Sequence, residues 1–312
     1  MPRPFIIITG TVFILLAIIL LGSFGHVRNA ISAGSEIIQS HIPASKFSSV
    51  WHSSALIPPK HHNGTKLHIA FYTGGLGAGY FRWAYEFLES ATEHFCKNDF
   101  VQVDYFIFSN HPAPANFPAN YHVLPVVERG WPHDSQDKFI WIHEHATANP
   151  DYDYILWMDA AQRFERPICF DLLGELVAVA HPHYYDGVTS HFPYESHVES
   201  KAYIPFDNAR VQQYYSSNFF GGTYAKILSA TKTIYDWMEE DLIKGFHARM
   251  KDESYLNAYF YYNFPTAVLS RIFVWPDGYE NQMSLMLDRH GGRSEAAAVA
   301  RYMANKPHED DL

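Results

Sequence analysis

The sequence predicts an α/β domain with a mixed, mainly parallel central sheet, preceded by a transmembrane helix. Two observations lead to this prediction. Residues 5–24 contain no charged side chain, and from residue 66 onward short apolar stretches alternate with amphipathic helical patterns. Strands that alternate with helices are typical of mainly parallel sheets, because each helix carries the chain back to the start of the next strand.

The apolar stretch Phe5–Phe24 is expected to cross a membrane once. A helix that rises about 1.5 Å per residue makes this stretch long enough for a hydrocarbon core of about 30 Å. The alternative is a cleaved signal peptide, whose apolar region is usually about 7–15 residues long and ends at a small-residue cleavage site. This stretch is longer and has no such site, so we favour a signal anchor in a type II protein of the secretory pathway.

The anchor divides the chain into four predicted parts. Residues 1–4 are a short tail and residues 5–24 are the anchor. Residues 25–65 carry Ser, His, Pro and Gly without sustained periodicity, which is typical of a stem that holds a domain off the membrane. Residues 66–312 are the predicted globular domain.

The composition argues against one class of partner. The 312 residues are 47% hydrophobic and carry a formal net charge of −10, with a pI of about 6.0. Nucleic-acid binding would favour a basic face, so we expect no nucleic-acid partner. The two cysteines, Cys96 and Cys169, are too few for a disulfide framework, and the pattern leaves open whether they form one bridge or remain two buried thiols.

The elements of the domain follow from apolar periodicity. We expect strands at residues 67–72, 101–108, 121–127 and 153–158, and helices at residues 81–95 and 135–146. The last strand runs directly into Asp159. Ligands of parallel sheets bind outside the carboxyl ends of the strands, so Asp159 is expected at a binding site. The alanine-rich residues 295–304 are expected to form an exposed tail helix.

Three further segments combine with the strand that ends at Asp159. They are AYIP at residues 202–205, YYSSNFFGG at residues 214–222 and DESYLN at residues 252–257. In this order and spacing the segments resemble glycosyltransferase family 6, the family of blood-group A/B transferases and α1,3-galactosyltransferases. The resemblance runs from about residue 66 to residue 293. It implies a GT-A type nucleotide-sugar-binding fold and, for anchored members, the Golgi.

The resemblance also implies a reaction. It is the transfer of galactose or N-acetylgalactosamine from UDP-galactose or UDP-N-acetylgalactosamine to a β-galactoside-type glycan acceptor, in α1,3 linkage with retained configuration. Glu253 falls on the family's catalytic carboxylate, which stabilises or bonds to the anomeric carbon as positive charge develops there. The alternative for Glu253 is a purely structural role, since acidic residues also suit the start of a helix.

The remaining family positions are assigned by the same resemblance. His181 and Trp275 fall on acceptor-binding positions. The donor-binding positions are Phe71, Tyr72, Thr73, Lys138, Asp159, Ala161, Ser216, Asn218, Lys251, Asp252, Arg289 and Arg293. In the family, uracil packs at the positions of Phe71, Tyr72 and Thr73, and the positions of Ser216 and Asn218 influence donor choice.

The chain departs from the family at its metal motif. Where members carry Asp-Val-Asp, this sequence reads Asp159-Ala160-Ala161. A hard divalent cation that bridges a diphosphate usually takes one or two carboxylates, and here one is offered. We therefore predict that no metal cofactor is required, with Mn²⁺ bound weakly through Asp159 as the alternative. Lys138, Arg289 and Arg293 would then stabilise the leaving diphosphate.

A second function follows if the missing metal ligand marks lost catalysis. The chain would then be a membrane-tethered pseudoenzyme that binds a sugar or a nucleotide sugar. The presence of both Asp252 and Glu253 favours the enzyme.

Overall fold

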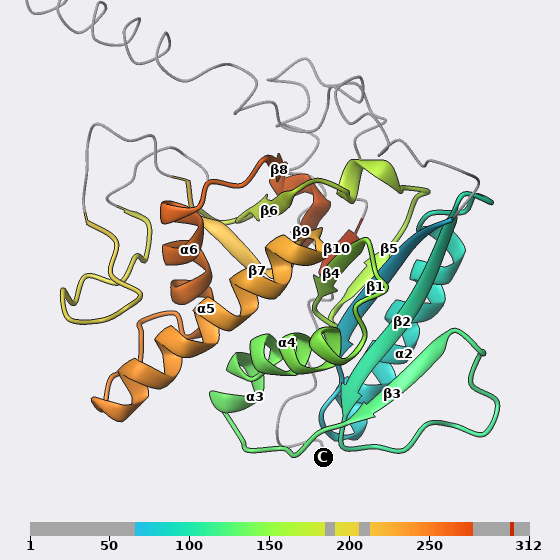
Figure 1. Cartoon of the computed structure of the whole chain (residues 1–312), viewed down its shortest axis with the longest axis horizontal. Coiled ribbons are helices and arrows are strands. Elements are labelled where there is room, and N and C mark those ends of the chain that lie inside the picture. The colour runs from blue at the N-terminus through green and yellow to red at the C-terminus, as the bar shows by residue number, and fades with distance from the viewer. Residues whose placement is uncertain (1–65, 185–190, 206–212, 277–299, 303–312) are drawn as a thin grey trace, which may run out of the picture. The chain divides into compact units, whose positions relative to one another are not determined.

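The computed structural model describes residues 66–184, 191–205, 213–276 and 300–302 (Figure 1). The strands in these ranges are β1 (Leu67–Gly74), β2 (Val101–Ser109), β3 (Tyr121–Pro125), β4 (Tyr154–Met158), β5 (Gln162–Phe164), β6 (Leu176–Ala180), β7 (Tyr215–Thr223), β8 (Ala267–Leu269), β9 (Val274–Pro276) and β10 (Ala300–Tyr302). The helices are α2 (Gly77–His94), α3 (His133–Gln136), α4 (Lys138–Ala148), α5 (Tyr224–Ile243) and α6 (Asp252–Tyr262), with short 3₁₀ turns at η2 (Phe170–Leu172) and η4 (Arg271–Phe273).

Seven of these strands form one sheet in the order β3-β2-β1-β4-β7-β6-β8. β1 lies parallel to both β2 and β4, β2 lies parallel to β3, and β6 lies parallel to β8. β7 runs antiparallel to its neighbours β4 and β6. The prediction of a mixed, mainly parallel sheet is therefore confirmed. The helix predicted at residues 135–146 is interrupted at Asp137, where α3 ends and α4 begins.

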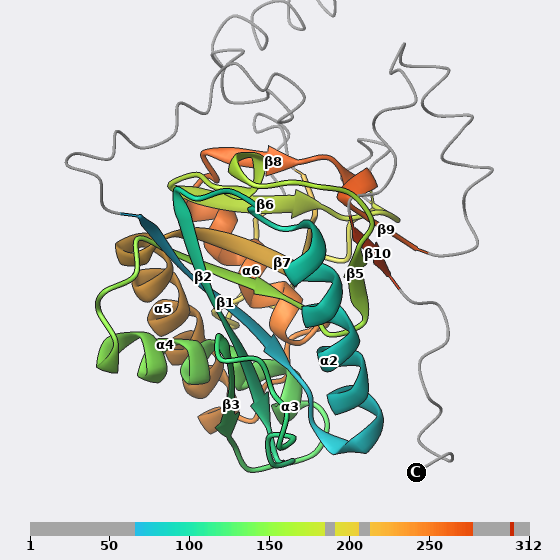
Figure 2. The same ribbon diagram turned by 90° about the vertical axis from the view of Figure 1, so that its right-hand side faces the viewer.

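The two faces of this sheet carry separate hydrophobic cores. Successive strand residues point to opposite faces, so Phe71 enters one core and Tyr72 the other. The Phe71 face is covered by α2, and the Tyr72 face by α4, α5 and α6. Figure 2 shows the sheet edge-on between α2 on one side and α4 and α5 on the other. The domain is thus a three-layer α/β/α arrangement.

The FFGG segment lies where β7 packs closely against the two strands beside it, β4 and β6. A side chain at Gly221 would collide with Leu156 of β4, and one at Gly222 would collide with the Glu175 carbonyl beside β6. Glycine is therefore required at both positions for β7 to join the sheet. This close packing fixes the strand from which the site residues at its other end project.

A second sheet of three strands has the order β5-β10-β9. β10 pairs antiparallel with β5 and parallel with β9. The prediction of a tail helix is therefore wrong for residues 300–302, because their backbone groups pair with two neighbouring strands. The other residues of the predicted tail helix lie outside the described part of the chain.

Cys96 and Cys169 form a disulfide bond. It joins the chain just after α2 to the residue before η2. The bridge settles the alternative that the sequence leaves open.

The predicted tail, anchor and stem at residues 1–65 lie outside the described residues. Among the helices of the described ranges, none combines the length and the apolar character needed to cross a membrane.

Candidate active site

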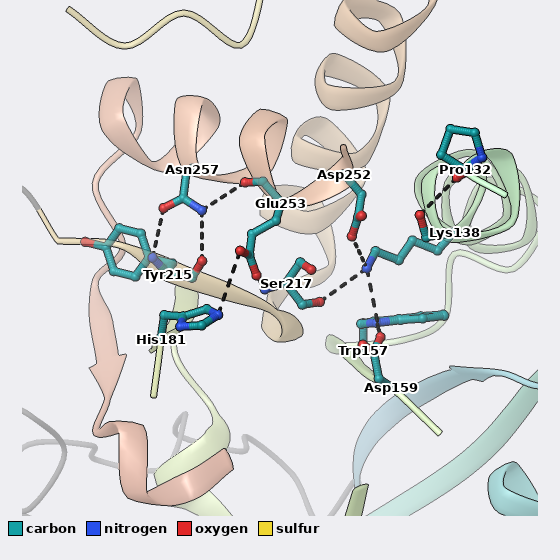
Figure 3. A network of polar contacts seen from close by, with 11 residues as sticks. Pro132, Lys138, Trp157, Asp159, His181, Tyr215, Ser217, Asp252, Glu253 and Asn257 are labelled. Atoms are coloured by element: carbon teal, nitrogen blue, oxygen red, sulfur yellow. Dashed lines mark hydrogen bonds and ion pairs between the residues drawn. The ribbon is translucent and has the colours of Figure 1, made fainter. Parts of the chain in front are cut away.

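Four elements bring polar side chains together at the carboxyl end of β4 (Figure 3). Asp159 directly follows β4, and Lys138 is the first residue of α4. His181 directly follows β6, and Asp252 and Glu253 are the first two residues of α6. The fold thus gathers side chains that are far apart in the sequence, such as Lys138 and Asp252 at a separation of 114 positions.

Glu253 is the central carboxylate of this group. Its side chain is nearly buried, and its Oε2 accepts a hydrogen bond of 3.0 Å from the backbone N–H of Ser217. Burial raises the pKa of the Glu253 carboxyl to about 7 and the Asp252 carboxylate adds to this, while the Ser217 N–H and the Lys138 ammonium act in the opposite direction. Buried carboxyl groups with a pKa near neutrality are typical of catalytic sites.

Lys138 is a buried ammonium shared between carboxylates. Its Nζ lies 2.7 Å from Asp252 Oδ2 and 3.9 Å from Asp159 Oδ1, and it donates to the Ser217 carbonyl at 3.3 Å. Burial by itself lowers the pKa of Lys138, but the two carboxylates outweigh burial, and the net direction is upward. Lys138 therefore stays charged and neutralises part of the negative charge of the site.

Asp159 is partly exposed beside this ammonium. Its Oδ1 accepts a hydrogen bond of 2.8 Å from Trp157 Nε1, and its backbone N–H donates to the Asn218 carbonyl at 2.9 Å. These contacts fix the carboxylate at the end of β4, beside β7.

Among the described residues, those around Asp159 do not fit a Mn²⁺ ion. The one carboxylate of the motif, Asp159, already receives Trp157 N–H on the oxygen that faces the Lys138 ammonium. A dication there would be repelled by the ammonium, and the methyl group of Ala161 offers no ligand. Within the described ranges, no group of three His, Cys, Asp or Glu side chains is arranged to hold a metal ion.

His181 faces Glu253 as a neutral imidazole. Its Nε2 lies 3.9 Å from Glu253 Oε1. Burial lowers the pKa of His181 to about 3, and the nearby His183 contributes to the lowering. The contact with Glu253 is thus not an ion pair at neutral pH. Because Nδ1 accepts the His183 N–H at 3.1 Å, the neutral ring carries its proton on Nε2, toward the carboxylate.

The start of α6 is held against β7 by Asn257. The Asn257 side chain accepts the Tyr215 N–H and donates to the Tyr215 carbonyl, both at 2.8 Å, and it also donates to the Glu253 carbonyl at 2.9 Å. One amide therefore joins α6 to the first residue of β7 and fixes the turn that bears Glu253. This explains the asparagine in DESYLN.

The expectation that uracil packs on the rings of Phe71 and Tyr72 is wrong for those side chains. Both rings are fully buried, Phe71 among aromatic side chains of the α2 core and Tyr72 against Phe106 and Phe108 in the other. The apolar character that suggested a base platform instead fills the two cores. Thr73, at the same strand end, is also fully buried, and its hydroxyl finds no partner among the described residues.

Of the other predicted donor and acceptor positions, three have described side chains near the site and three do not. Ser216 and Asn218 are buried on β7 next to the site, and Lys251 directly precedes Asp252 with a half-buried side chain. Trp275 lies in β9, but its side chain is outside the described part of the structure. Arg289 and Arg293 fall in the range 277–299, which the structure does not describe.

Three residues of the site were missed by the sequence reasoning. They are Trp157 and Asn257, through the hydrogen bonds given above, and Tyr214. The Tyr214 hydroxyl is buried near Glu253, and burial together with the Glu253 carboxylate raises the pKa of Tyr214. All three lie inside the recognised segments, but the contacts of Asn257 and Tyr214 depend on how β7 meets α6.

Comparison with known protein families matches residues 65–297 to Glycosyltransferase family 6. The match covers well over half of the sequence. The chain belongs to glycosyltransferase family 6. The family resemblance found in the sequence is thereby confirmed, and the site at the start of α6 lies inside the matched range.

Several curated proteins are similar to this chain. Globoside alpha-1,3-N-acetylgalactosaminyltransferase 1 of Homo sapiens is 32% identical over 218 residues, which cover 67% of this chain and 62% of that protein. Histo-blood group ABO system transferase 2 of Rattus norvegicus is 32% identical over 197 residues, covering 61% of this chain and 58% of that protein. Glycosyltransferase 6 domain-containing protein 1 of Macaca fascicularis is 32% identical over 213 residues, covering 66% of each. The chain thus spans about three fifths of the first two relatives.

Proposed function

We propose that this chain is a retaining hexosyltransferase. It would move galactose or N-acetylgalactosamine from the UDP-sugar to a β-galactoside-type glycan, forming an α1,3 linkage. The observation that carries the proposal is the Glu253 carboxylate, which is buried at the start of α6 and fixed by the Ser217 N–H. The family and the names of the relatives support the class of reaction.

The site offers the groups that retaining transfer needs. Positive charge develops at the anomeric carbon as the bond to the diphosphate breaks, and a carboxylate on the opposite face stabilises that charge or bonds to the carbon. Glu253 would take this role. Asp252, oriented by Lys138, would accept hydrogen bonds from the donor sugar, and His181 would help to seat the acceptor.

The described site needs additional positive charge for a diphosphate. Lys138 is its one buried ammonium among the described residues, and it faces Asp159 and Asp252. A leaving diphosphate is stabilised by preorganised cations. We therefore propose that Lys251 and the undescribed Arg289 and Arg293 supply this charge.

The proposal is tested with a panel of UDP-sugars and simple β-galactosides, scored by product mass and linkage. Transfer from UDP-galactose or UDP-N-acetylgalactosamine to O3 with retained configuration is the expected result. Binding of UDP-sugar without any transfer or hydrolysis would instead support the pseudoenzyme. A product of inverted configuration would contradict the role given to Glu253.

We predict that transfer does not require a metal ion. Because the Lys138 ammonium lies where a cation beside Asp159 would be bound, EDTA is expected to change kcat by less than about twofold. Rates are measured in EDTA and again after Mn²⁺ is added in excess. Activity that disappears in EDTA and returns with Mn²⁺ would contradict this and would favour a metal bound through Asp159.

We also propose that the domain works in the lumen of the secretory pathway, most simply the Golgi, on a single N-terminal span at residues 5–24. The Cys96–Cys169 disulfide supports an oxidising compartment. Protection of the domain from protease in sealed microsomes, lost on addition of detergent, tests this orientation.

A further inference from the structure

Another buried carboxylate, that of Glu195, takes no part in the contacts described so far. Glu195 is 9% exposed and belongs to the segment 191–205. Its Oε1 accepts the backbone N–H of His197 and its Oε2 accepts the backbone N–H of Arg249, each at 2.8 Å. One carboxylate therefore joins this segment to the turn that leads into α6.

The segment that carries Glu195 is itself firmly held. The Glu195 carbonyl accepts the Ile204 N–H at 3.2 Å. The fully buried carboxylate of Asp241 accepts the hydroxyls of Ser200, at 2.6 Å, and of Tyr255 in α6, at 3.1 Å. The segment that bears Glu195 is thus fixed by hydrogen bonds, so Glu195 can hold the turn in place.

The turn that Glu195 contacts contains a strained residue. Lys251, the residue before α6, has φ of 51° and ψ of −127°, in a region that favours glycine. Such conformations persist only where surrounding contacts impose them, and they concentrate at functional sites. Lys251 N–H donates to the Ala248 carbonyl, and Glu195 binds Arg249 between these two residues. The two residues that follow Lys251 are Asp252 and Glu253.

We propose that Glu195 is a positioning residue: its carboxylate holds the turn at residues 248–251, and through it the strained Lys251, in the geometry that aims Glu253 into the site. The inference rests on the proposed function, since it names what places the carboxylate of that reaction. Both donors to Glu195 are backbone N–H groups, and an ionised carboxylate accepts two such bonds more strongly than a neutral amide. A glutamine at this position has one carbonyl oxygen, so its NH₂ group would oppose one of the two N–H donors.

The test compares Glu195→Gln with Glu199→Gln, a matched change at an exposed glutamate of the same segment. Misplacing a catalytic group by a fraction of an ångström to about 1 Å lowers the rate without abolishing donor binding. Glu195→Gln is expected to lower kcat about tenfold or more while the KM for UDP-sugar changes less than about twofold. Glu199→Gln is expected to leave both constants unchanged.

Hydrogen exchange of the backbone amides at residues 249–254 provides a second measurement that does not depend on turnover. These amides are expected to exchange at least about tenfold faster in Glu195→Gln than in the parent chain or Glu199→Gln. If the parent chain transfers no sugar, the proposed function fails while the exchange measurement still judges the role of Glu195. Unchanged kcat together with unchanged exchange in Glu195→Gln would overturn the inference, as would a loss of kcat that equals a loss of folded protein.

Discussion

Replacing Glu253 by glutamine is expected to lower kcat for sugar transfer by about a thousandfold or more. Removing one preorganised group that stabilises transition-state charge costs about 10²–10³ in rate, and losing the group that faces the reacting carbon costs at least as much. The amide oxygen of the substituted side chain can still accept the Ser217 N–H, so the fold is retained and the loss reports on the negative charge. Single-turnover rates measure this, and Glu199→Gln serves as the exposed control.

The same carboxylate should give the parent chain an acidic limb in its pH–rate profile. The pKa of Glu253 is raised to about 7, and only the ionised form stabilises positive charge. The rate is therefore expected to fall as the pH decreases through about 7. A rate that stays level between about pH 8 and pH 5 would contradict the assignment, as would a Glu253→Gln variant that keeps more than about a tenth of the parent rate.

The substitution at Glu253 is also expected to stabilise the fold. The pKa of the carboxyl is about 7 in the folded state against 4.5 for the free group, so the folded state holds the proton more tightly. Its ionisation therefore destabilises the fold progressively as the pH rises from about 4.5, and fully above about 7. At about 1.4 kcal/mol per pKa unit, Glu253→Gln should gain about 3 kcal/mol at about pH 8 and almost nothing near pH 4. Urea unfolding at the two pH values measures the difference.

The four predicted strands were accessible from sequence because each depends on local pattern, whereas the central carboxylates were assigned by the resemblance to family 6. The run at residues 153–158 is almost entirely apolar, and its predicted end just before Asp159 agrees with the end of β4 at Met158. The DESYLN segment carries its two acids at the start of a helix, as the structure has them. Local pattern therefore located the strand that ends at the site, and the family resemblance located the helix start that bears Glu253.

The remaining features depend on tertiary contacts that no local pattern encodes. The burial of the Phe71 ring follows from α2 and β2 packing on it, so its aromatic character could not distinguish a core residue from a base platform. The strand at residues 300–302 exists through its pairing with two strands that lie elsewhere in the sequence. The ion pair of Lys138 with Asp252 likewise joins two residues 114 positions apart, which the sequence reasoning assigned separately to the donor.

Replacing Lys138 by methionine is expected to destabilise the fold by about 3–5 kcal/mol and to abolish transfer. The ammonium is 3% exposed and lies 2.7 Å from Asp252, so its removal leaves a buried carboxylate without its partner. Methionine is similar in length and keeps the apolar packing of the side chain. Without the cation, the carboxylates of Asp159 and Asp252 would also repel the diphosphate of the donor. Urea unfolding and transfer assays measure the two effects.

Two further variants separate the buried charge from the rest of Lys138. Lys201→Met removes an ammonium from an exposed pair with Glu240, whose side chains are 39% and 51% exposed, and should cost no more than about 1 kcal/mol. The double variant Lys138→Met, Asp252→Asn removes both partners of the buried pair and is expected to recover more than half of the lost stability, because no unpaired charge is left at that contact. The double variant should remain inactive, since the site then lacks the Asp252 carboxylate that is proposed to accept hydrogen bonds from the donor sugar. If Lys138→Met were as stable as Lys201→Met, the buried pair would not be holding α4 against the start of α6. The position of that helix start would then depend on the Asn257 contacts with β7.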